Sequence, residues 1–223
     1  MPKIPFDESI RGKDIVSRRI TIAIPLLGNP PIDFVASYMN LDKPNHYLIT
    51  TNAVPIDTAR NDLVKMFLVQ HPDSSHILFW DSDICPPPDG LRKLWSHNKP
   101  IVSGLYFRKV PPFYPVMSIW NPSLGGLSPV IAWEDGKLIP VDGVGMGFCL
   151  IRRDIFQALD PPWFSFNNKY GCSEDYYFCL RVKEELGERV WVDTSVVCKH
   201  AANVLVDKDY YSAFRMRELN KGS

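Results

Sequence analysis

The sequence has no excess of either charge and no long hydrophobic run. Its 223 residues include 25 basic and 25 acidic side chains, which gives a formal net charge of zero. General nucleic-acid binders carry a basic surface, so we expect no nucleic-acid partner, although one local cluster could still hold a small anion. No apolar stretch approaches the roughly 20 residues that cross a bilayer, so no transmembrane segment is predicted.

Cysteine is scarce and unpaired. The five cysteines are odd in number and include no C-x-x-C motif, which disfavours a zinc site or a disulfide framework. A reducing compartment fits best, and we expect a cytoplasmic protein. Residues 1–18 are polar and lack the apolar core of a signal peptide, so we predict that they form an N-terminal arm.

What the sequence does contain is a regular alternation of apolar, β-branched runs with helical patterns. Expected strands cover 20–27, 47–51, 76–80, 101–107, 147–151 and 190–198. Expected helices cover 32–39, a segment capped by Asp57 or Thr58 that ends at Gln70, 89–97, 153–159, 173–186 and 207–219. This order predicts an α/β fold in which helices flank a mainly parallel, Rossmann-like sheet. Residues 111–140, rich in proline, glycine and aromatic side chains, are expected to form hairpins or a long loop.

Two aspartates, Asp81 and Asp83, directly follow the apolar run HILFW and precede a Cys-Pro-Pro-Pro turn. Ligands of open α/β sheets bind beyond the carboxyl ends of the strands, and two carboxylates at this spacing can reach one hard cation. The alternative is a pair of aspartates that cap a turn. A second match, Asp207-Lys208-Asp209, precedes the last expected helix, where acidic residues suit a helix start and little function is expected.

Two later segments add an acidic pair and a histidine. Ser173 is a plausible N-cap for a helix that begins with Glu174 and Asp175, because the helix dipole favours acids in a first turn. The alternative is a carboxylate that acts as general base on an acceptor hydroxyl. A lone histidine is usually structural, but His200 ends the last expected strand, at the same sheet edge as the aspartate pair. An Asp/Asp/His set suits Mn²⁺ or Mg²⁺, and the imidazole favours Mn²⁺.

Three glycines at alternate positions, Gly143, Gly145 and Gly147, lead into an apolar strand. Because the pattern precedes a strand and not a helix, it does not fit a dinucleotide-binding fingerprint. It allows either close approach of the backbone to a ligand or a tight β-turn.

Taken in order, these segments resemble the metal-dependent glycosyltransferases of the GT-A fold, family 2-like members in particular. The segments are ITIAIPLLG, IDTARNDLV, ILFWDSDICPPPDGL, VSGLYFRK, VDGVGMGFCLIRRDIF and SEDYYFCLRVKEELGERVWVDTSVVCKH. The last is the most specific, because it joins an acidic pair, an F-C-x-R helix, a W-V-D-T strand and a terminal histidine. The resemblance implies a hexosyltransferase-like enzyme. With a divalent cation it would move a sugar from a UDP- or GDP-sugar to the hydroxyl of an unknown acceptor.

The resemblance also implies roles for single residues. Asp81, Asp83 and His200 would hold the metal, with Asp83 as a direct ligand and Asp81 nearer the ribose or bound through water. Asp175 would be the base of an inverting reaction, with Glu174 beside it. The donor-binding set would be Pro25, Leu26 and Thr51 near the nucleobase, Arg60 on the diphosphate or on Asp81, Asp81 and Ser82 in the acidic motif, and Gly145 and Met146 under the sugar and acceptor. Four aromatic side chains of the 111–140 region would offer apolar faces to a sugar or simply pack the loop: Phe113, Tyr114, Trp120 and Trp133.

The expected organisation is a single domain over residues 19–203, with a nucleotide-sugar half at 19–110 and an acceptor half at 111–203. A helical tail follows at 204–223, with Tyr210, Tyr211, Phe214 and Met216 as its apolar residues. The tail could form a homodimer contact or lie on a membrane surface, but its mixed charges favour packing on the core.

Two other functions compete with this interpretation. A nucleotidyltransferase would need a glycine- and lysine-rich phosphate loop after the first strand, where this chain reads PLLGNPP. A carbohydrate- or nucleotide-binding module of the same fold could have lost turnover, but the expected acids and His200 are all present.

Overall fold

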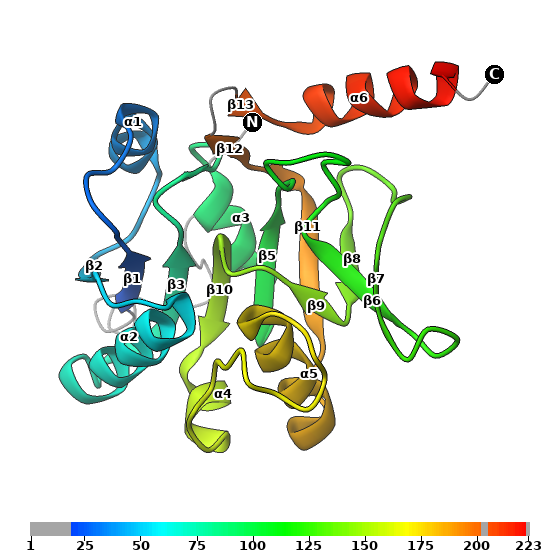
Figure 1. Ribbon diagram of the computed structural model, residues 1–223. Helices are drawn as coiled ribbons and strands as arrows, with labels where there is room; N and C mark the ends of the chain where they lie inside the picture. The colour runs from blue at the N-terminus through cyan, green and yellow to red at the C-terminus, as the bar shows by residue number, and fades with distance from the viewer. Residues whose placement is uncertain (1–18, 202–204, 222–223) are drawn as a thin grey trace.

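The computed structural model describes residues 19–201 and 205–221 (Figure 1). The arm expected at residues 1–18 lies outside the described residues. A seven-stranded sheet forms the centre of the molecule, in the order β2-β1-β3-β10-β5-β11-β8. Its strands are β1 (Arg19–Pro25), β2 (His46–Thr51), β3 (Ser74–Trp80), β5 (Ile101–Leu105), β8 (Leu138–Val141), β10 (Phe148–Arg152) and β11 (Val190–Val197).

Most strands of this sheet are parallel. β1 runs parallel to β2 and to β3, and β5 runs parallel to β11. β10 runs antiparallel to both of its neighbours, and β8 runs antiparallel to β11. Between β5 and β10 the chain forms β6 to β9 and no helix, so the crossover helix that usually joins parallel strands is missing before β10. The predicted α/β fold with a mainly parallel sheet is confirmed.

Helices cover both faces of the sheet. They are α1 (Ile32–Asn40), α2 (Ile56–Gln70), α3 (Gly90–Ser96), α4 (Arg153–Ala158), α5 (Glu174–Leu186) and α6 (Lys208–Lys221). One apolar cluster joins the sheet to α2, α4 and α5, and a second joins it to α1 and α3 (Figure 1). In β3, Ile77 and Phe79 enter the first cluster, whereas Leu78 and Trp80 enter the second. Burial on both faces explains why this strand is a continuous apolar run.

Helix α2 begins earlier than predicted, because its N-cap lies two residues before Asp57 and three before Thr58. Pro55 occupies the N-cap position, and neither Asp57 nor Thr58 caps the helix. Proline leaves no backbone N–H to satisfy at this position. The Asp57 carboxylate instead accepts hydrogen bonds from the backbone N–H of Thr58 at 2.8 Å and of Phe166 at 3.2 Å. Asp57 thus fastens the loop before α5 to the start of α2.

Two small antiparallel sheets flank the main sheet. One contains β6 (Met117–Asn121), β7 (Gly126–Pro129) and β9 (Gly143–Val144), where hairpins were predicted. The other contains β4 (Ile84–Cys85), β12 (Lys199–Ala201) and β13 (Leu205–Val206). The second sheet determines the site, because it joins the segment after β3 to the segment after β11.

The tail helix α6 lies across the end of the molecule that carries β12 and β13 (Figure 1). Tyr211 is buried and stacks on Phe107 with ring centroids 4.9 Å apart, and Phe214 packs edge-on against Phe113. Met216 is exposed, so the predicted apolar face is shorter than expected.

The second D-x-D match, Asp207-Lys208-Asp209, lies at the start of this helix. The Asp207 carboxylate accepts a hydrogen bond from the Tyr210 backbone N–H at 3.0 Å. An acidic residue at the helix start is what its place before a helix predicted, and the hydrogen bond to the first turn is the additional finding. No helix in the described part of the chain is long and apolar enough to span a membrane.

Candidate active site

The predicted nucleobase residues lie at the carboxyl ends of neighbouring strands. Pro25 and Thr51 are partners in the β1–β2 register, and the Leu26 backbone N–H donates to the Thr51 carbonyl at 2.8 Å. The Thr51 hydroxyl oxygen accepts a hydrogen bond from the Ala53 backbone N–H at 3.2 Å, which fixes the turn after β2. The structure therefore brings these three residues together at one end of the sheet.

The Asp81-Ser82-Asp83 motif begins directly after β3 and forms a tight turn. The Asp81 backbone N–H donates to the Gly147 carbonyl at 2.9 Å, and the Ile84 N–H donates to the Asp81 carbonyl at 3.0 Å. All three motif residues are half-buried. The turn sends the two acidic side chains to different partners, although they are only two residues apart.

Asp81 is held by Arg60 of helix α2. The guanidinium donates to both carboxylate oxygens, from Nη1 at 3.1 Å and from Nη2 at 3.2 Å. Its Nε donates to Glu174 Oε1 at 3.2 Å, and the guanidinium carbon Cζ lies 5.6 Å from the centroid of the Phe79 ring. The Arg60 side chain is only 4% exposed. Of the two partners predicted for Arg60, the diphosphate and Asp81, the described structure contains the contact with Asp81.

The charges around Arg60 compensate its burial. Burial alone would lower the pKa of Arg60, but the carboxylates of Asp81, Glu174 and Asp175 raise it above its ordinary value. A bidentate arginine–carboxylate pair fixes both groups in one orientation. Arg60 thus ties the end of β3 to the first turn of α5.

His200 lies near the motif because the chain passes from β11 of the main sheet into β12 of the small sheet that contains β4. After β11, the Cys198 N–H donates to the Leu105 carbonyl at 2.8 Å, and the chain then enters β12. In the pairing of β12 with β4, His200 is opposite Ile84, and the Ala201 N–H donates to the Asp83 carbonyl at 2.7 Å. The sequence placed His200 at the same edge as the motif, and this pairing brings the two into contact.

The imidazole of His200 has a defined orientation. Its Nδ1 lies 2.7 Å from the Phe107 carbonyl oxygen, which can only accept, so Nδ1 carries the proton. Its Nε2 lies 3.5 Å from Asp83 Oδ1. In metal sites the ligating histidine usually donates its other N–H to a carbonyl or carboxylate, in the same way.

Asp83 has a second partner that sequence reasoning missed. Lys109, from the loop after β5, donates through Nζ to Asp83 Oδ2. Burial acts to raise the pKa of Asp83, but hydrogen bonds and charge from His200 and Lys109 lower it to about 2. The carboxylate is therefore ionised over the whole physiological range. No short-range pattern in the sequence marks Lys109, because it lies 26 residues from its partner.

The two acids at the start of α5, Glu174 and Asp175, also have different partners, as Asp81 and Asp83 do. Glu174 is buried against Arg60, whereas Asp175 accepts hydrogen bonds at Oδ1 from the Ser173 hydroxyl and from the Tyr176 N–H. Burial, followed by the charge of Glu174, raises the pKa of Asp175 to about 6. Ser173 occupies the predicted N-cap position, but its side chain does not cap the helix. Its hydroxyl is oriented toward Asp175 instead.

The alternate glycines are required by packing. A Cβ at Gly145 would lie 2.0 Å from the Tyr106 hydroxyl, and one at Gly147 would lie 2.7 Å from the Tyr106 ring. The Gly147 N–H donates to the Tyr106 hydroxyl at 3.0 Å. Met146 is completely buried in the core, so its side chain offers no surface to a ligand in this structure. The close approach predicted for these glycines is an approach to a buried tyrosine.

The described residues contain no group of three His, Cys, Asp or Glu side chains arranged to hold a metal ion. Of the three predicted ligands, Asp83 and His200 converge, while Asp81 is bound to Arg60. A carboxylate and an imidazole oriented by a carbonyl are a donor pair that suits Mn²⁺.

The aromatic side chains of the 111–140 region differ in their burial. Phe113 is buried under α6, and Trp133 packs near Tyr211. Trp120 of β6 is partly exposed, and its backbone N–H donates to Asp142 Oδ2 at 2.7 Å. Ordinary packing therefore accounts for Phe113 and Trp133, and Trp120 keeps an accessible face.

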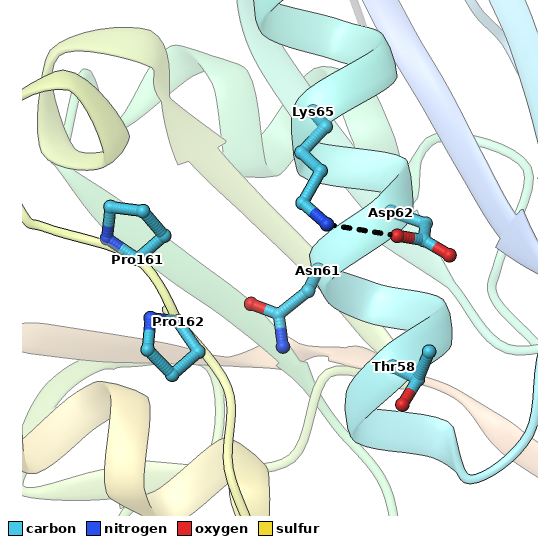
Figure 2. A pocket seen from close by; sticks show the side chains of 6 residues that line it. All are labelled: Thr58, Asn61, Asp62, Lys65, Pro161 and Pro162. Carbon is cyan, nitrogen blue, oxygen red and sulfur yellow. Dashed lines mark hydrogen bonds and ion pairs between the residues drawn. The ribbon is translucent and has the colours of Figure 1, made fainter.

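A separate open depression lies between α2 and the loop before α5, with a volume of about 410 Å³. Its lining residues are Thr58, Asn61, Asp62, Lys65, Pro161 and Pro162 (Figure 2). Three of its polar side chains, Asn61, Asp62 and Lys65, already have partners. The Asn61 amide bonds the backbone of Asp57, Trp163 and Phe164, and Lys65 donates to Asp62 at 3.2 Å. None of the predicted site residues lines this depression.

Comparison with known proteins identifies a shared fold but assigns the chain to no family. No protein-family model and no curated protein matches the sequence. The crystal structure of A197 from STIV superimposes with a TM-score of 0.62 at 20% identity, over 86% of this chain and 91% of that chain. A glycosyltransferase involved in the glycosylation of the major capsid of PBCV-1 gives a TM-score of 0.39 at 14% identity, over 75% of each chain. The chain thus shares its α/β fold with A197.

Proposed function

We propose that the protein is a metal-dependent glycosyltransferase that moves a sugar from a nucleotide-diphosphate sugar to an acceptor hydroxyl. One observation carries the proposal. Asp83 and His200, from distant parts of the chain, meet at the carboxyl edge of the sheet, and His200 directs Nε2 toward the carboxylate. Ligands of open α/β sheets bind at this edge. Pro25, Leu26 and Thr51 lie at the ends of β1 and β2 on the same edge, where a nucleobase would bind.

The proposed metal ligands are Asp83 and His200, with Mn²⁺ preferred over Mg²⁺ because of the imidazole. When bound, such a cation would stabilise the negative charge of a departing nucleoside diphosphate as a Lewis acid. Asp83 is suited to this role because its carboxylate is ionised at any physiological pH. The pair of Asp81 with Arg60 would hold in place the turn that carries Asp83.

Asp175 is the proposed general base of an inverting reaction. A base works best when its pKa is near the operating pH, and the pKa of Asp175 is raised to about 6. The hydrogen bonds from Ser173 and the Tyr176 backbone both end on Oδ1, and we assign Oδ2 to the acceptor hydroxyl. Trp120 supplies an accessible aromatic face for the acceptor or sugar.

The experiment is an assay of donor hydrolysis and transfer with a panel of UDP- and GDP-sugars, each with and without Mn²⁺. We expect turnover only with the metal. Asp175→Asn should keep donor affinity and lower turnover by about 10²–10⁴-fold, the range typical of a general base. Equal turnover without any divalent ion, or unchanged turnover in Asp175→Asn, would contradict the proposal. Asp62→Asn, a change to an exposed carboxylate in the depression of Figure 2, is the matched control.

A further inference from the structure

Lys109 occupies an unusual place for an exposed lysine. Its Nζ bonds Oδ2 of Asp83, while His200 Nε2 lies 3.5 Å from Oδ1 of the same carboxylate. The carboxylate proposed as the metal ligand therefore already has a cation beside it. Among the lysines and arginines of the described chain, Lys109 is the only one for which an ion pair with Asp83 is found.

The loop that carries Lys109 is anchored at its base. Phe107 pairs with Pro115 and stacks on Tyr211, and its carbonyl holds the His200 ring. The Arg108 N–H donates to the Tyr114 carbonyl at 2.9 Å. The same short segment thus orients one proposed metal ligand through its backbone and neutralises the other through a side chain.

The Lys109–Asp83 pair can be broken at little cost. The two side chains are 37% and 34% exposed, and ion pairs of this exposure contribute little to stability. An ammonium group on a flexible stem also adapts to new partners more readily than a guanidinium held in a fixed fork. By contrast, the nearby Arg60 is buried and makes three hydrogen bonds to carboxylates.

We propose that Lys109 is a displaceable counter-ion that holds Asp83 before substrate arrives and then binds the diphosphate of the donor. A divalent cation and the lysine compete for Asp83, since two cations beside one carboxylate repel each other. Once released, the ammonium lies next to the phosphates that accompany the metal, and phosphate oxygens accept charge-assisted hydrogen bonds from lysine. This inference rests on the proposed function and assigns a donor-binding role to a residue outside the predicted set.

The competition predicts effects of opposite sign on two ligands. In Lys109→Met, the affinity for Mn²⁺ alone should rise about two- to fivefold, the gain expected from removing an exposed ion pair. The affinity for UDP, GDP or pyrophosphate in saturating Mn²⁺ should fall about tenfold or more, as expected for loss of a hydrogen bond to a charged group. Electron paramagnetic resonance measures free Mn²⁺ in the first titration, and calorimetry measures the second. A merely structural lysine would not move the two affinities in opposite directions.

The controls separate this inference from the proposed function. Lys65→Met removes another exposed lysine that pairs with an aspartate, Asp62, and should change neither affinity. Lys109→Arg keeps the charge and should stay near the wild type in both titrations. If Asp83→Asn leaves Mn²⁺ affinity unchanged, the proposed metal site is wrong. If Asp83→Asn abolishes Mn²⁺ binding while Lys109→Met changes neither affinity, only the role of Lys109 is wrong.

Discussion

The two acids of the Asp81-Ser82-Asp83 motif differ sharply in environment. Asp81 is bound by two nitrogens of the buried Arg60, which also holds Glu174. Asp83 contacts the half-exposed Lys109 and the imidazole of His200. Both acids belong to the same tight turn, so their difference comes from the elements that pack on each side.

The contrast divides the motif into a structural half and a reactive half. The Asp81 carboxylate is fixed by a bidentate pair with the buried Arg60, and removing Arg60 would also leave the charge of Glu174 uncompensated in the interior. Asp83 is exposed to a similar extent, but its partner is the adaptable and exposed Lys109, so its charge stays available to an incoming cation. The same division recurs in α5, where Glu174 binds Arg60 and Asp175 has a raised pKa of about 6.

The largest effect is expected from breaking the buried pair. Arg60→Met leaves Asp81 and Glu174 without their partner and should lower the free energy of unfolding by about 3–5 kcal/mol, as for other broken buried pairs. Chemical denaturation monitored by circular dichroism measures it. Lys109→Met is the matched control, and its cost should stay below about 1 kcal/mol because the pair is exposed. Similar costs for the two variants would remove the distinction between the two halves.

The two aspartates should differ in what their loss affects. Asp83→Asn should reduce Mn²⁺ affinity by more than about tenfold, since a direct ligand matters at least as much as its outer-shell partners. Asp81→Asn should lower the free energy of unfolding by about 1–3 kcal/mol through weakened hydrogen bonds to Arg60, with a smaller change in Mn²⁺ affinity. Metal titration and denaturation of both variants measure the two quantities. The reverse order of metal affinities would identify Asp81 as the principal ligand.

The smallest effect is a shift in the pH profile of transfer. Asp175 must be ionised to act as base, so activity should fall as pH decreases through about 6, its raised pKa. Glu174→Gln removes a negative charge that raises this pKa, and the acidic limb of kcat/KM should therefore move to lower pH. Transfer rates measured between pH 4.5 and 8 test it. Asp154→Asn, at an exposed Asp, is the control and should leave the limb in place. An unmoved limb in Glu174→Gln would argue against Asp175 as the titrating base.

Much of the fold follows from local sequence pattern. The apolar runs and helical spacings predict the strands of the main sheet except β8, together with the helices α1 to α5, and the mainly parallel sheet is confirmed. The pattern does not reveal strand direction, so the antiparallel β10 was not predicted. Nor does it reveal that β8 leaves the loop-rich region and joins the edge of the main sheet.

The residues of the candidate site can be predicted only in part from the sequence. The end of each strand marks Asp81, Asp83 and His200 as residues of one edge, because carboxyl ends of parallel strands meet there. The glycine pattern was visible, but its cause was not, since Tyr106 fills the space beside Gly145 and Gly147 from another strand end. Local spacing cannot distinguish a glycine that approaches a ligand from one that approaches a buried ring.

The sequence by itself determined the element order, the acids and the histidine at one edge of the sheet. Only the tertiary structure decided which charge meets which. Arg60 bonds Asp81 from 21 residues away and Glu174 from 114 residues away, while Lys109 reaches Asp83 across 26 residues. The physical reason is that periodicity is a property of neighbouring residues, whereas the partner of a charge is set by chain segments that meet only when the sheets assemble.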